Sequence, residues 1–284
     1  VVKNVAGYDL VRLQYGALGA LGVITAANFK LQPLPEESAA AIGTFATPAA
    51  AESVVRQLLA ARLQPAAVLV ISDVEHTPRK RWQLWVRFDG RYRAVLRQAS
   101  EVVELARAAA GASVAALDAK TVDERWPALV DFSQMADVGD DEVLLRINVR
   151  SSDSLAVLSA HDAQCVALGL SVTSLADAAC GVIWLRIQAP AGQLDAQLPS
   201  LLQEWRAQRT QIVVAAASPG RRAQLDLWGP HHSALSVMQR LKRHFDPDGM
   251  LNAGRDLVSA SLIAASGDGS RGSLCAERQV SHVG

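Results

Sequence analysis

The chain has 284 residues, half of them apolar and a fifth charged, with 28 basic side chains balancing 28 acidic ones. This composition supplies a full core for one or two domains, whereas a neutral chain without a basic run argues against binding to nucleic acid or an anionic membrane. No apolar stretch reaches the roughly 20 residues that cross a bilayer, and the N-terminus lacks a signal-peptide pattern, so a cytoplasmic location is expected.

The first half of the chain predicts a β-α-β-β-α-β order after a connector at Pro33 and Pro35. Apolar residues recur on one side of each expected helix, and alternate along the expected strands. The strands are expected at 40–46, 66–72, 81–90 and 112–117, and the helices at 49–63 and 92–110.

The same order recurs after a helix and loop at 118–141. One of Ser151, Ser152 and Asp153 is expected to cap the first helix, and Pro199 to lie in the first turn of the second or to kink it. A split β-α-β unit used twice predicts an α+β fold with a wide antiparallel sheet and helices on one face. The strands are expected at 141–150, 170–176, 181–189 and 211–217, and the helices at 151–169 and 193–208.

The C-terminal part predicts a last helix at about 230–244. A tight turn at 246–249 follows, where proline and glycine occupy the positions that such a turn favours. Beyond Asp256 the tail is rich in Ser, Gly and Ala and has no amphipathic pattern, so most of it is expected to be disordered.

Glycines recur every third residue near the N-terminus, at Gly16, Gly19 and Gly22, directly before the strand-like Val23-Ile24-Thr25. Glycine lets the main chain approach a flat ligand and leaves N–H and C=O groups available to it. A plain turn between a helix and a strand explains the spacing equally well. The pattern is not the dinucleotide-binding G-x-G-x-x-G, because no strand precedes it.

Two stretches carry a resemblance to a known family. The first resembles the closing part of the FAD-binding domain in flavoproteins of the vanillyl-alcohol oxidase (PCMH) type, and the second resembles their C-terminal signature. The closest likeness within this family is to the FAD-binding E subunits of bacterial glycolate oxidases. The stretches are "VKNVAGYDLVRLQYGALGALGVITAANFKLQPLP" and "LKRHFDPDGMLNAGR".

The resemblance implies FAD as the cofactor and assigns binding residues by position. Asn4, Val5, Gly7 and Tyr8 match a segment that runs along FAD near the flavin and the diphosphate. Asn252 matches an asparagine close to the isoalloxazine ring, although turn and capping chemistry explains it and Arg255 as well. The segment whose backbone contacts the adenosine end is matched by Gly19, Leu21, Gly22, Val23 and Ile24.

The resemblance also implies the domain organisation. Residues 1–36 correspond to the C-terminal part of the FAD-binding domain, 37–228 to a cap or substrate domain, 229–256 to a segment that returns to the FAD domain, and 257–284 to the tail. Relatives carry a pyrophosphate-binding glycine-rich loop ahead of these residues, so the chain is expected to be truncated at its N-terminus. FAD binding by the chain alone is therefore an open question, and apolar edges are expected to be exposed.

The catalytic machinery is not evident from the sequence. Catalytic relatives place a Glu-His-Gly motif before the final helix to supply a base and a metal site, and this chain lacks that motif. His231 and His232 at the expected helix start read as surface or capping residues, since consecutive helical residues point in different directions. No catalytic base is assigned.

Metal and disulfide sites are not expected either. Cys165, Cys180 and Cys275 are too widely spaced for a disulfide framework or for an iron–sulfur or zinc site, so free thiols are expected. Three arginines on expected strands are expected either to face solvent or to bind a substrate carboxylate through paired hydrogen bonds. These arginines are Arg146, Arg150 and Arg186.

Three functions are consistent with these observations. The first is the FAD-binding subunit of a glycolate oxidase, which works with a catalytic flavin subunit and an iron–sulfur subunit to oxidise a small 2-hydroxy acid. The second is a self-sufficient FAD-dependent 2-hydroxy acid oxidase or dehydrogenase. The third is an interaction subunit that has lost flavin. The first is preferred, because both the Glu-His-Gly motif and a cysteine cluster are absent.

Overall fold

The computed structural model describes residues 9–73, 81–109, 113–134, 138–208, 210–229 and 233–252. The chain forms two compact units. Unit 1 comprises Val1–Leu31 and Pro230–Gly284, and unit 2 comprises Gln32–Gly229. Each unit is described by itself below.

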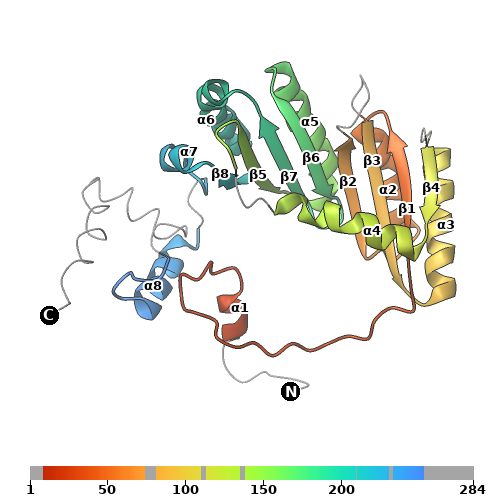
Figure 1. Cartoon of the computed structure of the whole chain (residues 1–284), viewed down its shortest axis with the longest axis horizontal. Helices are drawn as coiled ribbons and strands as arrows, with labels where there is room; N and C mark the ends of the chain where they lie inside the picture. The colour runs from red at the N-terminus through yellow and green to blue at the C-terminus, as the bar shows by residue number, and fades with distance from the viewer. Residues whose placement is uncertain are drawn as a thin grey trace. The chain divides into compact units, whose positions relative to one another are not determined.

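Unit 2 is built on one antiparallel sheet of eight strands in the order β4-β1-β3-β2-β6-β7-β5-β8 (Figure 1). The order of the first four strands reappears, reversed, in the last four, so the two split β-α-β units meet edge to edge at β2 and β6. The expected wide antiparallel sheet is confirmed. The strands are β1 (Glu37–Phe45), β2 (Ala67–Asp73), β3 (Arg81–Gly90), β4 (Ser113–Leu117), β5 (Glu142–Asn148), β6 (Ser171–Asp177), β7 (Val182–Gln188) and β8 (Gln211–Ala217).

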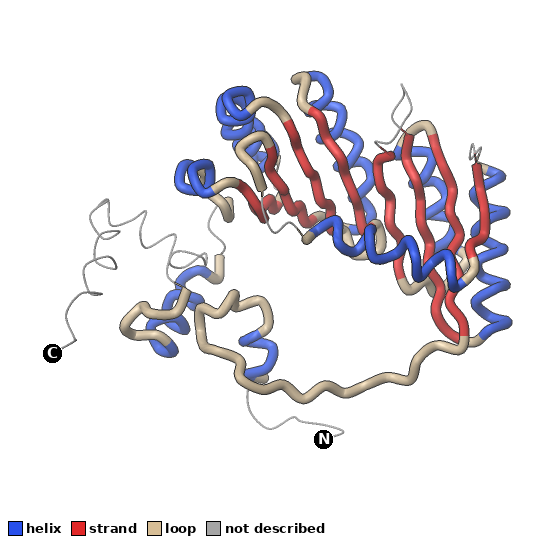
Figure 2. Tube along the Cα trace, in the orientation of Figure 1, coloured by secondary structure: helices blue, strands red, loops and turns tan. Residues whose placement is uncertain are grey.

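The helices of unit 2 cover mainly one face of this sheet (Figure 2). The face beneath α2, α3, α5 and α6 holds the main apolar core, and α4 lies across the opposite face against β1. The expectation of helices on one face was wrong for α4, whose Leu129 is buried with Trp85 on that other side. The helices are α2 (Pro48–Ala60), α3 (Tyr92–Ala108), α4 (Ala119–Val130), η1 (Asp131–Ser133), η2 (Ser151–Asp153), α5 (Ser154–Ala167), α6 (Ala191–Ala207) and α7 (Pro219–Gln224).

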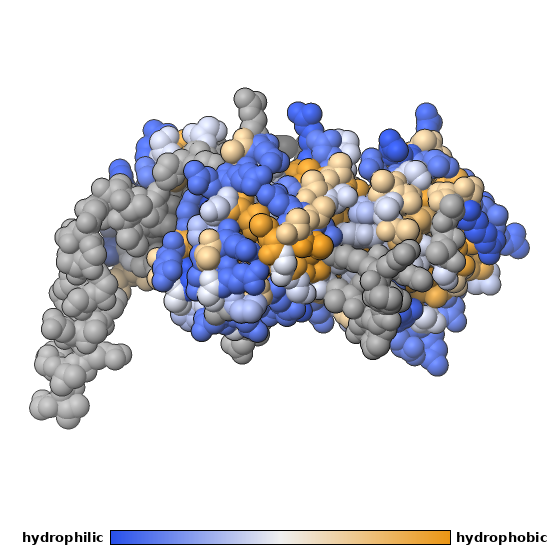
Figure 3. All heavy atoms as spheres, turned by 90° about the horizontal axis from the view of Figure 1, so that it is seen from above, coloured by the Kyte–Doolittle hydropathy of each residue, from blue (hydrophilic) through white to orange (hydrophobic). Residues whose placement is uncertain are grey.

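Strand alternation divides the side chains between the two faces. On β5, Val143, Leu145 and Ile147 belong to the core beneath the helices, whereas Leu144 belongs to the smaller cluster on the other face. The face seen in Figure 3 is largely hydrophilic where it is coloured, with hydrophobic residues gathered in patches. The face without the helix layer carries both the buried Leu144 and the exposed Arg146.

Several local expectations needed correction. Asp153 occupies the N-cap of α5, but its backbone is helical there and its carboxylate accepts a hydrogen bond from Ser152 Oγ, so it makes no capping bond. Pro199 lies in the interior of α6 and not in the first turn, so one backbone hydrogen bond is forgone there. Helix α7 was not expected, because its sequence PGRRAQ lacks an amphipathic repeat.

Candidate functional site

The glycine-rich segment of unit 1 is a tight loop that follows a short helix. Helix α1 (Leu10–Gln14) begins at Asp9, whose carboxylate accepts a hydrogen bond from Arg12 N at 3.2 Å. Beyond the helix the backbone enters the left-handed region at Gly16 (φ 78°), Leu18 (φ 52°) and Gly19 (φ 70°). Glycine adopts this region without steric cost, so the spacing of the first two glycines reflects the turns of this loop.

The stretch after Gly22 was expected to be a strand and is not one. It runs extended, but no described strand pairs with it. A β-strand needs a hydrogen-bonding neighbour, and the backbone groups of Val23 and Ile24 make no hydrogen bond to another described residue. Their side chains are 77% and 67% exposed, as expected for an apolar edge.

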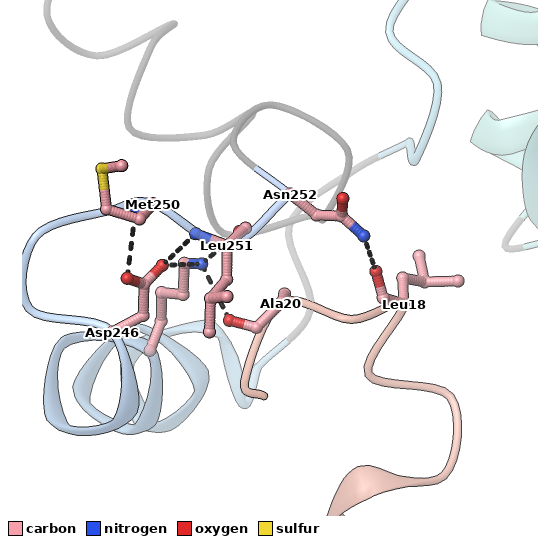
Figure 4. A network of polar contacts seen from close by, with 7 residues as sticks. Leu18, Ala20, Asp246, Met250, Leu251 and Asn252 are labelled. Carbon is pink, nitrogen blue, oxygen red and sulfur yellow. Dashed lines mark hydrogen bonds and ion pairs between the residues drawn. The ribbon is translucent and has the colours of Figure 1, made fainter. Parts of the chain in front are cut away.

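Helix α8 (Leu235–Phe245) holds this loop through a buried lysine (Figure 4). Lys242 Nζ donates hydrogen bonds to the carbonyl oxygens of Ala20 and Leu251, each at 2.8 Å, and lies 2.6 Å from Asp246 Oδ2. A buried ammonium group is stable only when its donors are satisfied. Lys242 therefore joins three separate segments at one point.

The carboxylate of Asp246 organises the turn that follows α8. It accepts hydrogen bonds from the backbone N–H groups of Met250 and Leu251, both at 2.9 Å. The hydrogen bond from Lys242, followed by that from Leu251 N–H, lowers the pKa of Asp246. The predicted turn is present, with Gly249 N–H bonded to Asp246 O and a φ of 64° at Gly249.

Asn252 lies at the end of this turn and points toward the glycine-rich loop (Figure 4). Its Nδ2 donates to Leu18 O. A Cβ on Gly19 would lie only 2.7 Å from the same Nδ2. Asn252 can approach the loop this closely because Gly19 has no side chain.

These segments enclose a pocket of about 440 Å³ within unit 1, a size in the range of small-molecule sites. The pocket contains five of the predicted cofactor residues, whereas Leu21 is not among its lining residues. Its lining consists of Gln14, Gly19, Gly22, Val23, Ile24, Met250, Leu251 and Asn252.

The chemistry of this lining fits a flat, uncharged ring of FAD. Among the described residues the lining has no charged side chain, while Gln14 and Asn252 carry amides and the backbone N–H and C=O groups of 22–24 make no hydrogen bond to another described residue. Apolar walls with a few amide groups suit a heteroaromatic ring, whereas a diphosphate favours cations or a helix N-terminus. The structure also brings Gly19 and Asn252, which the resemblance assigned to opposite ends of FAD, to one pocket.

Other predicted residues fall elsewhere. Asn4, Val5, Gly7, Tyr8, Arg255, His231 and His232 and the tail lie outside the described residues. Cys165 is buried and Cys180 is exposed, and neither forms a disulfide with a described residue, while Cys275 is not described. Within the described ranges, no three His, Cys, Asp or Glu residues form a group that could hold a metal ion.

Lys242 and Asp246 are the site residues that the sequence interpretation missed. Asp246 was seen only as the first residue of a turn, and Lys242 only as one of several basic residues near a helix end. Their spacing of four residues, which brings side chains together on a helix, was the signal that could have identified them as an ion pair. None of the described helices combines the length and apolarity needed to span a membrane.

Comparisons with known proteins find similarity to FAD-linked oxidases in parts of the chain. The family model "FAD linked oxidases, C-terminal domain" matches residues 229–255, the stretch that contains Lys242, Asp246 and Asn252. The chain is 40% identical over 68 residues to glycolate oxidase subunit GlcD of Bacillus subtilis (strain 168), a match covering 24% of this chain and 14% of the relative. Glycolate oxidase subunit GlcE of Escherichia coli (strain K12) is 31% identical over 90 residues, covering 32% and 23%.

A third relative is the mitochondrial D-lactate dehydrogenase [cytochrome] of Arabidopsis thaliana, 37% identical over 73 residues, which cover 26% of this chain and 13% of that protein. The matched stretches thus span less than a third of each of these relatives.

A solved alkyldihydroxyacetonephosphate synthase has a similar fold, with a TM-score of 0.54 and 14% identity over 88% of this chain and 50% of that protein. Over the matched stretches the chain is similar to FAD-linked oxidases, and these similarities indicate FAD as its cofactor.

Proposed function

We propose that this chain is the FAD-binding subunit of a glycolate oxidase that oxidises a small 2-hydroxy acid to the 2-oxo acid. The observation that carries the proposal is the neutral pocket where the loop of Gly19 meets Asn252. Similarity to the glycolate oxidase subunits GlcD and GlcE supports the reaction class. FAD, when bound, accepts the two electrons released by the substrate.

The residues of the pocket hold one ring system of FAD in this proposal. The Asn252 amide and the open backbone of Gly22 and Val23 offer hydrogen bonds to the ring edge, while Ile24 and Met250 shield its face from water. Lys242 does not line the pocket. It positions the two loops that do, because it bonds to both Ala20 O and Leu251 O.

The proposal includes partners. A catalytic flavin subunit supplies the base that this sequence does not reveal, and an iron–sulfur subunit passes electrons onward. The names of the GlcD and GlcE relatives support a complex of several subunits. The cytoplasmic location expected from the sequence stays a prediction.

A self-sufficient FAD-dependent 2-hydroxy acid oxidase or dehydrogenase is the second candidate. It is favoured by the 37% identity to a D-lactate dehydrogenase. Turnover of D-lactate or glycolate by the FAD-loaded chain without any added subunit would select it over the subunit role.

The first test is a titration of FAD into the purified chain, in which quenching of flavin fluorescence measures binding. The same titration is made on the longest polypeptide that the native reading frame encodes. Gly19→Ala is expected to weaken binding about tenfold or more, because its new Cβ drives Asn252 away from Leu18 O. Asn252→Ala should have a similar effect.

Gly16→Ala is the matched control. Gly16 has a similar φ of 78°, but nothing lies within 4 Å of its Cβ position. This variant carries the same backbone strain without the collision, so its FAD affinity should stay within about threefold of the parent. Equal loss in Gly16→Ala and Gly19→Ala, or no FAD binding by any form, would refute the pocket assignment.

A further inference from the structure

The face of the unit 2 sheet that lacks the helix layer carries an exposed arginine on an aromatic platform. Arg146 on β5 lies directly opposite Trp184 on β7, and its Cζ is 5.8 Å from the indole ring centroid. Arg146 is exposed and forms no ion pair with any described residue. A guanidinium stacked in this way keeps its planar edge available for hydrogen bonds.

A second arginine lies one diagonal step away on the same face. Arg186 on β7 pairs with Leu144, two residues before Arg146 on β5. Diagonal neighbours of this kind are close enough for long side chains to reach one ligand. The Arg186 Cζ stacks 5.2 Å from the ring centroid of Phe132, and its side chain is 32% exposed.

The charge of these two arginines is only partly balanced. Arg186 Nε lies 3.4 Å from Glu142 Oε1, yet this buried nitrogen has no hydrogen-bond partner in the part of the chain that the structure describes. Glu142 Oε1 also accepts a hydrogen bond from Gln188 Nε2. Asp177, the acidic residue of β6 on this face, accepts hydrogen bonds from its own turn at Ala179 and Cys180. One carboxylate therefore faces two guanidinium groups.

The surroundings favour a small organic acid over a bare ion. Strand register places the apolar Leu144, Trp184 and Val213 and the polar Thr173 beside the two arginines. Two guanidinium groups bind a carboxylate through paired hydrogen bonds. The partly exposed Trp184 and Val213 offer apolar surface to a short carbon chain, whereas Leu144 is buried. We propose that Arg146 and Arg186, backed by Trp184, form a binding site for the carboxylate of a small organic acid.

This site deepens the proposed function, because the choice of a 2-hydroxy acid as its ligand rests on that function. The carboxylate binding itself requires no FAD. The test is calorimetric titration of glycolate into the chain in a chloride-free buffer, with the uncharged glycolamide as the reference compound. Glycolate should bind and glycolamide should not.

Variants assign the binding to named residues. Arg146→Gln should weaken glycolate binding about tenfold or more, because it removes a charged donor pair. Arg186→Lys keeps the charge but loses the planar fork, and should weaken binding several-fold. Arg97→Gln on α3 removes an exposed arginine that already pairs with Glu101, and should change nothing. Melting curves confirm that each variant is folded.

The outcomes separate this site from the flavin pocket. Unchanged glycolate affinity in Arg146→Gln, no glycolate binding by the parent, or full displacement by equimolar chloride would each overturn the carboxylate site. Glycolate binding that depends on Arg146 in a chain that fails to bind FAD would uphold the site and refute the proposed function. Binding of FAD without glycolate would do the reverse.

Discussion

Each of the two units is stabilised internally by a different kind of interaction. Unit 2 has a continuous apolar core between its sheet and four helices. In the described residues of unit 1, the buried side chains are those of Ala20, Lys242 and Asp246. Unit 2 is thus organised by apolar burial, and unit 1 by one buried ion pair with its hydrogen bonds.

This difference predicts that the two units differ in stability. A unit with a large apolar core tolerates substitutions on its surface, whereas a buried ion pair is stable only when every one of its partners is present. Unit 1 also exposes Phe29 and Leu31 at more than 80%. Its loops are therefore expected to open more readily than the sheet of unit 2.

The largest expected effect is the loss of a core side chain in unit 2. Phe88 on β3 is 1% exposed and belongs to the core beneath the helices. Phe88→Ala should lower the free energy of unfolding by about 3–5 kcal/mol, because it removes apolar burial and leaves a cavity. Urea unfolding followed by circular dichroism measures this. A loss below about 1 kcal/mol would mean that the core is not closely packed.

The next effect concerns unit 1 alone. Lys242→Met leaves the Asp246 carboxylate buried without its cation and two carbonyl oxygens without their donor. Hydrogen exchange at Met250 and Leu251 should become much faster, while exchange in the sheet of unit 2 stays the same.

Arg243→Met is the control for this change, because Arg243 is the exposed neighbour on the same helix. The double variant Lys242→Met with Asp246→Leu also removes the acceptor of the Met250 and Leu251 N–H groups, so exchange at these two amides should be at least as fast as in Lys242→Met. If Arg243→Met speeds exchange as much as Lys242→Met, the ion pair does not hold the loops.

A smaller effect depends on pH. His161 on α5 is 3% exposed, its ring centroid lies 4.1 Å from that of Trp205 with the rings tilted by 55°, and its Nε2 has no hydrogen-bond partner among the described residues. Burial lowers the pKa of His161, so the unfolded chain binds the proton more readily than the folded one. Stability should therefore fall as the pH drops below about 6.5, by at most about 1.4 kcal/mol per pH unit from this group.

His161→Leu should remove this part of the pH dependence. The measurement compares the urea midpoint at pH 7.5 and pH 5.5 in parent and variant. The same shift in both proteins would show that another group causes it.

The smallest expected effect is at the exposed edge of unit 1. Leu31 is 86% exposed, so Leu31→Ser should change the free energy of unfolding of this chain by no more than about 0.5 kcal/mol. A thermal melt of parent and variant checks this. A loss above about 1 kcal/mol would show that Leu31 is covered in solution.

The sequence by itself determined the order of elements in unit 2. Alternating apolar residues along 81–90 matched β3 to the residue, because a strand with one core-facing side needs that alternation. The apolar run at 211–217 matched β8 to the residue as well. Apolar residues on one side of 92–108 likewise located α3. The glycines and the turn at 246–249 also followed from local backbone requirements.

Only the tertiary structure decided what these local features do together. Val23 and Ile24 have a strand-like sequence, but a strand forms only where a partner offers hydrogen bonds. The bond from Lys242 to Ala20 O joins residues 222 positions apart, and the approach of Asn252 to Gly19 spans a similar separation. Local sequence patterns report on neighbours within a few residues, whereas such contacts depend on how the whole chain folds.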